Sequence, residues 1–317
     1  MLAVLFVAVL AVAYANGANA NFKAVASLYG SGTTSYRRAV HWAAVTTAAG
    51  GLASVALAGA MLKAFSGKGL VPDALIAGPA FLPAVAGGAA LAGLLATRWG
   101  FPVSTTHLLM GALLGAGWTA GEVHVGRLWQ SFVQPLLLSP VLAVAAGGLL
   151  YLALKGLRLA PDHRTRTLDA LHFLSAGAVG FARGLNDTPK MAALLLGIGW
   201  LSGEVGPLAI LAAMTLGGLI SARRVAETLA HKITDMNPGQ GFAANLATAL
   251  LVTTASLHAL PVSTTHVSVG ALLGIGITTR QAKWRTVLPV LAAWVITLPC
   301  AALLAALLFA ALRLWLP

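Results

Sequence analysis

The chain has 317 residues, of which 58% are hydrophobic and only 9% are charged. Soluble domains carry roughly 25% charged residues, so this composition excludes an ordinary soluble protein and predicts a polytopic membrane protein. The formal net charge of +12 would indicate a nucleic-acid partner in a soluble protein, but here we expect the lipid bilayer, and no nucleic acid, as the surroundings of the charge.

Apolar segments recur along the whole chain, at lengths that bracket the roughly 20 residues needed to cross a bilayer core. The first, 2–15, resembles the apolar core of a signal peptide, but no Lys or Arg precedes it and a counterpart at 168–182 lies inside the chain, so we interpret it as a short first transmembrane helix. The other segments are 39–65, 73–97, 105–120, 130–156, 168–183, 206–222, 242–258, 264–279 and 286–315. We expect one integral domain in which some of these segments are half-helices.

Cations gather in three connections, 155–166, 223–232 and 280–285, which we expect to face cytoplasm and anionic lipid. Others, such as Arg37, Lys63 and Arg98, are scattered over several turns. The distribution of positive charge therefore leaves the membrane orientation open.

The hexapeptide Pro-Val-Ser-Thr-Thr-His occurs twice, at 102–107 and 261–266, and each copy runs on into Gly-Ala-Leu-Leu-Gly. A hydroxyl-rich segment duplicated inside an apolar chain is typical of a secondary transporter, in which two related halves each contribute a broken helix near the membrane middle. A second pair of motifs, Gly-Ala-Asn-Ala-Asn-Phe-Lys at 17–23 and Gly-Leu-Asn-Asp-Thr-Pro-Lys at 184–190, extends the repeat. We predict a single transporter domain, 1–317, with repeat 1 at about 1–158 and repeat 2 at about 165–317, and about five crossings or half-crossings in each, a number that favours inverted topology.

The chemistry of the duplicated motifs points to an oxyanion. Each hexapeptide supplies three hydroxyl donors, and its proline lies where a helix would start, because the missing N–H costs nothing there. The free N–H groups and the positive dipole end of such a helix favour a bound anion. Amides and ammonium groups of the upstream motifs add donors and charge. The predicted anion-binding residues are Asn19, Lys23, Ser104, Thr105, Thr106, Asn186, Lys190, Ser263, Thr264 and Thr265.

Simpler explanations exist for single members of this set. One hydroxyl in a membrane helix usually bonds its own backbone or a neighbouring helix, and a lysine can snorkel to the headgroups, but clustering and duplication favour a site. For His107 and His266 we prefer a structural hydrogen bond to a metal site or a proton relay, because no Cys or nearby carboxylate completes a ligand set; we expect no cofactor and no metal. The glycines of 111–115 and 270–274 need only a packing explanation.

Asp187 has the clearest functional position among the acids, because the chain has only eight carboxylates and this one lies inside the second Gly-x-Asn motif. A carboxylate within the membrane is a candidate sodium ligand, a protonatable coupling group, or the partner of Lys190 or Lys23. Its counterpart in the first half is Ala20. Glu227 lies in a basic amphipathic stretch and is interpreted as a surface partner of the neighbouring cations.

Together these motifs resemble those of the inorganic phosphate transporter family, usually called PiT, whose members carry two Gly-Ala-Asn-Asp-like motifs and two copies of Pro-Val-Ser-Thr-Thr-His. The resemblance covers nearly the whole chain, including 223–245. It implies an all-α polytopic transmembrane bundle of two inverted repeats with discontinuous helices or re-entrant hairpins, and a homodimer. Carried over by position, the phosphate site would comprise Asn19, Asn186 and the hydroxyls of 104–106 and 263–265, with Asp187 as the coupling acid.

Two features depart from the family pattern. Lys23 and Lys190 stand where the family has its second Asn, and Ala20 stands where it has its first Asp. Replacing an acid by alanine and amides by cations disfavours a cation site, so we expect H⁺ as the coupling ion, with Na⁺ as the alternative. A single sequence leaves open whether Ala20 is natural or engineered.

The sequence therefore predicts a secondary transporter that moves inorganic phosphate by alternating access, coupled to H⁺, in a bacterial inner membrane. Phosphate at neutral pH keeps a proton that it can donate to an ionised Asp187, which favours it over sulfate. The alternatives are a permease for sulfate or a related oxyanion and a passive anion channel. We do not expect an enzyme, because no carboxylate follows Ser104 and His107 at matching spacing in either half.

Overall fold

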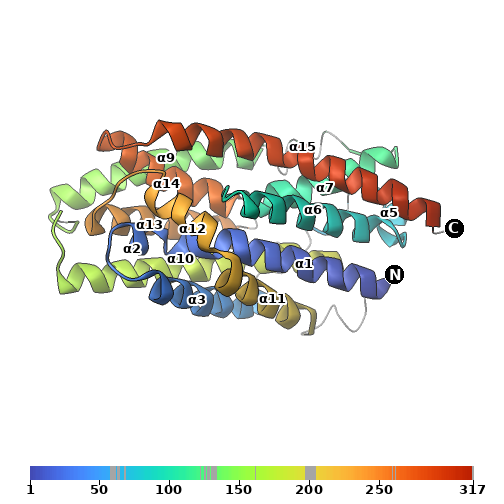
Figure 1. Ribbon diagram of the computed structural model, residues 1–317, viewed down its shortest axis with the longest axis horizontal. Helices are drawn as coiled ribbons and strands as arrows, with labels where there is room; N and C mark the ends of the chain where they lie inside the picture. Colours follow the sequence, from blue (N-terminus) through green and yellow to red (C-terminus); the bar gives the residue numbers. More distant parts are fainter. Residues whose placement is uncertain are drawn as a thin grey trace.

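The computed structural model describes residues 1–57, 62, 65–67, 69–121, 123–124, 126, 129, 134–160, 162–196, 205–258, 260 and 262–315. All the named elements in this part of the chain are helices, which lie roughly along one long axis (Figure 1). The long helices of the first half are α1 (Leu2–Ala20), α3 (Tyr36–Leu57), α6 (Phe81–Arg98), α7 (Thr105–Thr119) and α9 (Gln134–Gly156). Those of the second half are α10 (Arg166–Ala192), α11 (Val205–Ser221), α13 (Pro238–Leu257), α14 (Thr264–Thr278) and α15 (Trp284–Trp315). Shorter elements are η1 (Asn21–Ala24), α2 (Ala26–Gly30), α5 (Asp73–Ala77), η3 (Ala193–Leu195) and α12 (Arg223–His231).

Several of these helices are long and apolar enough to cross a membrane. Within the described residues there are five such stretches, or six if α11 and α12, which meet at a bend of 69°, count as one span. Large apolar side chains such as Val7, Leu149 and Val295 are exposed on their outer faces, where lipid rather than water would surround them. The predicted class of a multi-pass, all-α membrane protein is confirmed.

The helix boundaries differ from the sequence-based ones at three places. The predicted segment 73–97 is divided into α5 and α6, because Gly78 leaves the helix in an extended conformation and Pro79 follows it. α1 and α10 continue through the Gly-x-Asn motifs instead of ending before them, so Asn19 and Asn186 lie on helices. Helix propensity disfavours glycine and asparagine there, and tertiary contacts override it.

Helices of one half pack mainly against helices of the other half. α1 packs along α11 and α10 along α3, while α7 packs along α15 and α14 along α9. Each contact therefore has a counterpart in which the two halves are exchanged.

Glycines allow this close approach. A Cβ on Gly17 would lie 1.9 Å from the carbonyl oxygen of Met214, and one on the matching Gly184 would lie 2.1 Å from that of Thr47. Gly115 and Gly274 likewise face backbone carbonyls of the opposite half, at 1.9 and 2.1 Å. The packing explanation for the motif glycines is confirmed.

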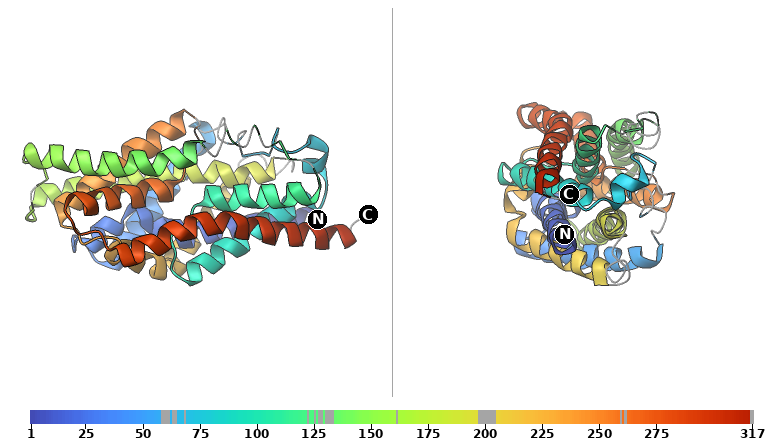
Figure 2. Two further views of the ribbon diagram at one scale, coloured as in Figure 1. Left: turned by 90° about the horizontal axis from the view of Figure 1, so that it is seen from above. Right: turned by 90° about the vertical axis from the view of Figure 1, so that its right-hand side faces the viewer.

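The two short helices α7 and α14 begin near the middle of the molecule and run toward opposite ends (Figure 2). Each has 15 residues, so at 1.5 Å per residue it spans about 22 Å, less than the bilayer core of about 30 Å. α7 is embedded in one apolar cluster, with residues such as Phe81 and Leu109, and α14 in another, with Leu168 and Leu272. The polar hexapeptides therefore meet where the two clusters adjoin.

Candidate anion site

Two helix N-termini meet at the centre of the site, and a serine caps each of them. The Oγ of Ser104 accepts a hydrogen bond from the backbone N–H of His107 at 3.3 Å, and Ser263 does the same for His266 at 3.1 Å. A hydroxyl that accepts in this way still has its own proton to donate. Both caps therefore keep one donor for a ligand beside the positive end of a helix dipole.

The prediction that a proline starts each helix is wrong for the first hexapeptide. Pro102 lies in the non-helical segment that precedes α7, and the helix begins at Thr105. Ser104 serves better at the boundary because its side chain bonds an N–H that would otherwise have no partner. Pro261 lies outside the described residues.

The third hydroxyl of each hexapeptide crosses to the other half. Thr106 donates to the carbonyl oxygen of Val262 at 3.3 Å, and Thr265 donates to that of Val103 at 2.7 Å. These reciprocal bonds hold the starts of α7 and α14 together.

Lys23, on η1, is buried next to one of these crossing points, with 2% of its surface exposed. Its Nζ donates to the carbonyl oxygen of Val103 at 2.9 Å and to the Oγ1 of Thr265 at 2.5 Å. The side chain points into the protein and does not snorkel to the surface.

Lys190, on α10, occupies the matching position at the other crossing point and is 1% exposed. Its Nζ donates to the carbonyl oxygen of Val262 at 3.2 Å and to the Oγ1 of Thr106 at 3.1 Å. It also donates to the Oδ1 of Asn186 and pairs with the Oδ1 of Asp187 at 3.0 Å. Of the roles considered for Asp187, the structure shows the ion pair with Lys190.

Asn19 and Asn186 are both bonded to protein groups. The Nδ2 of Asn19 donates to the carbonyl oxygen of Phe101 at 2.9 Å, and its Oδ1 accepts from the N–H of Val103 at 2.8 Å. The Nδ2 of Asn186 donates to the Oγ of Ser256 at 2.8 Å. Asn19 thus fixes the segment that leads into α7.

Sequence reasoning missed Arg183, which is 1% exposed and lies one turn before Asp187 on α10. Its Nε is 3.5 Å from the Oδ2 of Asp187, its Nη1 donates to Thr47 at 3.2 Å, and its Nη2 donates to the Oδ1 of Asn16. Asn16 in turn donates to the Oγ1 of Thr105 at 2.7 Å. The spacing of four residues to Asp187 places both on one helix face and could have revealed the arginine.

Positive charge exceeds negative charge in this region. Among the described residues the buried charged side chains are Lys23, Arg183, Lys190 and Asp187, three cations with one acid. The site therefore carries a formal excess of two positive charges. A dianion at this position would balance it.

His107 and His266 make backbone contacts rather than forming an ion site. The Nδ1 of His107 is 2.9 Å from the carbonyl oxygen of Trp294, and that of His266 is 3.3 Å from that of Leu136. The two rings meet edge to face with centroids 4.6 Å apart, and His266 stacks on Trp294. Both histidines pack at the junction of α7, α14 and α15.

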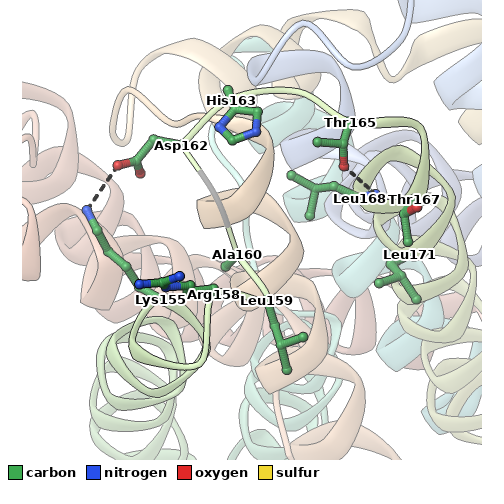
Figure 3. Close-up of a pocket in the computed structure, with 10 residues that line it drawn as sticks. All are labelled: Lys155, Arg158, Leu159, Ala160, Asp162, His163, Thr165, Thr167, Leu168 and Leu171. Carbon is green, nitrogen blue, oxygen red and sulfur yellow. Dashed lines mark hydrogen bonds and ion pairs between the residues drawn. The ribbon is translucent and has the colours of Figure 1, made fainter.

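A separate surface pocket of about 550 Å³ lies at the connection between α9 and α10 (Figure 3). Lys155 and Asp162 pair across it at 3.1 Å, and hydrogen bonds from Lys155 and Asn237 lower the pKa of Asp162. None of the predicted anion-binding residues lines it. This pocket belongs to the basic 155–166 connection and not to the candidate site.

A multi-pass helical bundle in which two short helices meet at a buried charged site has the architecture of a secondary transporter. The sequence profile of the phosphate transporter family matches residues 16–305. The chain belongs to that family.

Individual relatives and one solved structure agree with this assignment. A protein of Rhizobium meliloti, named a probable low-affinity inorganic phosphate transporter, is 32% identical over 259 residues, which cover 77% of each chain. A protein of the same name from Mycobacterium bovis is 28% identical over 324 residues, covering 96% of this chain and 76% of the relative. A solved structure titled "The sodium-dependent phosphate transporter" has a TM-score of 0.83 at 20% identity, with 99% of each chain covered, and shows that the fold is shared. The bacterial relatives and the apolar helices place the chain in a bacterial cell membrane as a multi-pass protein.

Proposed function

We propose that this protein is a secondary transporter that moves inorganic phosphate across the membrane by alternating access, with the anion bound between the N-termini of α7 and α14. The observation that carries the proposal is the buried excess of two positive charges beside two helix N-termini. Divalent phosphate would balance this charge and accept hydrogen bonds from the free donors of both helix starts. Membership of the phosphate transporter family gives the substrate class.

The two halves, about 1–158 and 165–317, are inverted repeats in this proposal. Two observations support the inversion: α1 and α10 run in opposite directions along the long axis (Figure 1), as do α7 and α14. Helix contacts also recur with the halves exchanged. Rocking of one set of helices against the other would open the central site alternately to each side of the membrane.

Within the site we assign two roles to the predicted residues. The cap hydroxyls of Ser104 and Ser263, and the neighbouring Thr105 and Thr264, lie at the helix starts and donate to the anion. The remaining predicted residues hold the two helix starts together and supply positive charge: Asn19, Lys23, Thr106, Asn186, Lys190 and Thr265.

We propose H⁺ as the coupling ion, with Na⁺ as the alternative. A sodium ion would add to the excess of positive charge and needs its own set of oxygen ligands. A proton needs no such set of ligands, because it can travel on the phosphate itself. Uptake should therefore follow an imposed pH gradient in the absence of sodium. Coupling to H⁺ in this way does not require the homodimer that the resemblance implies.

We propose phosphate rather than sulfate as the substrate because of the family to which the chain belongs. The argument from the sequence, that Asp187 accepts the phosphate proton, does not support this choice. The Asp187 carboxylate is paired with Lys190 and accepts from Asn16 at 3.2 Å, so it is not a free acceptor for a phosphate proton. Sulfate has the same tetrahedral shape and remains the natural competitor in an experiment.

Uptake of radiolabelled phosphate into proteoliposomes that contain the full chain tests the proposal, with protein-free liposomes as the control. We expect uptake that saturates, that is accelerated by unlabelled phosphate inside the vesicles, and that resists excess sulfate. Flux that rises linearly with concentration would indicate a channel. Strong inhibition by sulfate would move the assignment to a sulfate permease.

A further inference from the structure

Four oxygen atoms of different chemistry surround the ammonium group of Lys190. They are the carboxylate Oδ1 of Asp187 at 3.0 Å, the hydroxyl Oγ1 of Thr106 at 3.1 Å, the carbonyl oxygen of Val262 at 3.2 Å and the amide Oδ1 of Asn186. Carboxylate, carbonyl, amide and hydroxyl oxygens are the ligands that proteins use for hard metal cations. We call these four oxygens the Lys190 cage.

The ammonium fills this cage in the structure. It has three N–H donors and four acceptors in range, so all its donors are directed to the protein. Asn186 and Asp187 lie four and three residues before Lys190 on α10, so the side chain turns back onto its own helix. No donor of Lys190 is left over for a substrate in this conformation.

A sodium ion does not fit the same cage beside the ammonium. Sodium dependence is named for the similar solved structure, and a bound sodium ion needs oxygens that converge on an open centre. Here the four oxygens converge on the Nζ of Lys190, and the Nε of Arg183 lies 3.5 Å from the second oxygen of Asp187. Repulsion from these two cations would oppose a third one.

We propose that the Lys190 ammonium is a tethered cation that takes the place of a diffusible sodium ion, so that its removal turns the Lys190 cage into a sodium site. The inference rests on the proposed function and goes beyond it, because it assigns the residue that decides the cation requirement. Lys190 then stabilises bound phosphate by charge and by positioning Thr106, without touching the anion.

Lys23 provides a matched comparison within the same molecule. Its Nζ has the equivalent carbonyl and hydroxyl partners, Val103 and Thr265, but the residue three positions before it is Ala20 where Lys190 has Asp187. A hard cation without a carboxylate ligand is held weakly. Removal of Lys23 should therefore lower uptake without creating a sodium site.

The first experiment measures phosphate uptake into proteoliposomes in sodium salt and in potassium salt. We expect equal rates in the two salts for the unaltered protein. Lys190→Ala should be slow in potassium and faster in sodium by about fivefold or more, in the range of coupling between two ligand sites. Lys23→Ala should be slow in both salts, and adding Ala20→Asp to it should confer a sodium response.

A second experiment measures sodium binding directly and does not depend on transport. The melting temperature of detergent-purified Lys190→Ala should rise with sodium concentration and saturate, while potassium has no such effect, because a ligand that binds the folded state stabilises it. The unaltered protein should show no saturable rise. If Lys190→Ala does not fold, Lys190→Asn, which removes the charge and shortens the side chain so that the centre of the Lys190 cage is open, replaces it.

Folded Lys190→Ala that shows no saturable sodium effect on its melting temperature would overturn the inference, and so would sodium-dependent uptake by the unaltered protein. The first result would leave the proposed function unchanged, and the second would change only its coupling ion, from H⁺ to Na⁺. Conversely, failure of the unaltered protein to take up phosphate would overturn the proposed function, while sodium stabilisation of Lys190→Ala would still support the tethered cation.

Discussion

At the scale of single residues, Asp187 is the one acid among the buried charged side chains that the structure describes at the site. It lies between Arg183 and Lys190 on the same helix, at 3.5 and 3.0 Å, and all three side chains are fully buried. Removing one partner of a buried ion pair leaves an uncompensated charge, which costs far more than losing an exposed pair.

Asp187→Asn should therefore lower the free energy of unfolding by about 3–5 kcal/mol, because it leaves three buried cations without an acid. Thermal unfolding in detergent measures the change, with bound phosphate omitted. The matched control is Asp162→Asn, which breaks a pair whose side chains are 51% and 58% exposed and should shift the melting temperature little. Equal shifts in the two variants would contradict the role of Asp187 as the counter-ion of the buried cations.

Substitutions of a capping serine can separate its effect on helix stability from its effect on anion binding. Glycine at an N-cap costs only a few tenths of a kcal/mol relative to serine, and aspartate caps as well as serine does. Ser104→Gly should therefore keep the fold and raise the KM for phosphate by about fivefold or more, the loss expected for a hydrogen bond to a charged group. Ser104→Asp should also fold and should abolish uptake, because it places a carboxylate where the anion binds. Unchanged uptake in Ser104→Asp would remove the anion from this position.

At the scale of elements, glycines set the distance between the helices of the two halves. A Cβ on Gly184 would lie 2.1 Å from a backbone oxygen of α3, whereas one on Gly156, at the end of α9, would meet nothing within 4 Å. A backbone oxygen cannot rotate away as a side chain can, so the helices themselves would have to separate.

Gly184→Ala should destabilise the protein and reduce phosphate uptake, since α10 carries Arg183, Asp187 and Lys190. Gly156→Ala should be neutral or stabilise slightly, by at most about 1 kcal/mol, because alanine is the better helix former. Melting temperatures of the two variants check this. A Gly184→Ala protein as stable as Gly156→Ala would show that α3 and α10 are not closely packed.

The sequence predicted the elements better than their ends. An apolar segment of the sequence corresponds to each of the ten long helices in the part of the chain that the structure describes, but α1 and α10 were expected to stop before their Gly-x-Asn motifs. In the structure both helices continue, since cross-half contacts at Gly17 and Gly184 compensate for poor propensity. The start of α7 was also predicted incorrectly, at Pro102, because the capping serine two residues later determines where the helix begins.

At the scale of the whole molecule, duplication was the strongest signal in the sequence. Two copies of a specific motif predicted two related halves, a central polar site and the transporter class. The cross-half bonds could not be predicted, because nothing in the repeat shows that Lys23 reaches Thr265. Arg183 was missed because its counterpart in the first half is Asn16, so the repeat did not mark it, and only the folded chain brings the two together.

If the two halves are inverted repeats, as proposed, their matching connections lie on opposite sides of the membrane. His124 follows α7 and Gln281 follows α14, and both are exposed. In a Cys300→Ala background, which removes the single cysteine of the chain, His124→Cys and Gln281→Cys should react with a membrane-impermeant maleimide from opposite sides of sealed vesicles. Labelling of both positions from one side would mean that the halves are parallel repeats.

The central claim is that an anion binds between the N-termini of α7 and α14. The most direct measurement is a crystal structure grown with arsenate, a tetrahedral substitute for phosphate, in which the anomalous scattering of arsenic locates the anion. We expect one strong peak within hydrogen-bonding distance of the Ser104 and Ser263 hydroxyls. A peak elsewhere, such as in the pocket beside Lys155 and Arg158, with none between the two helix starts, would contradict the proposed site.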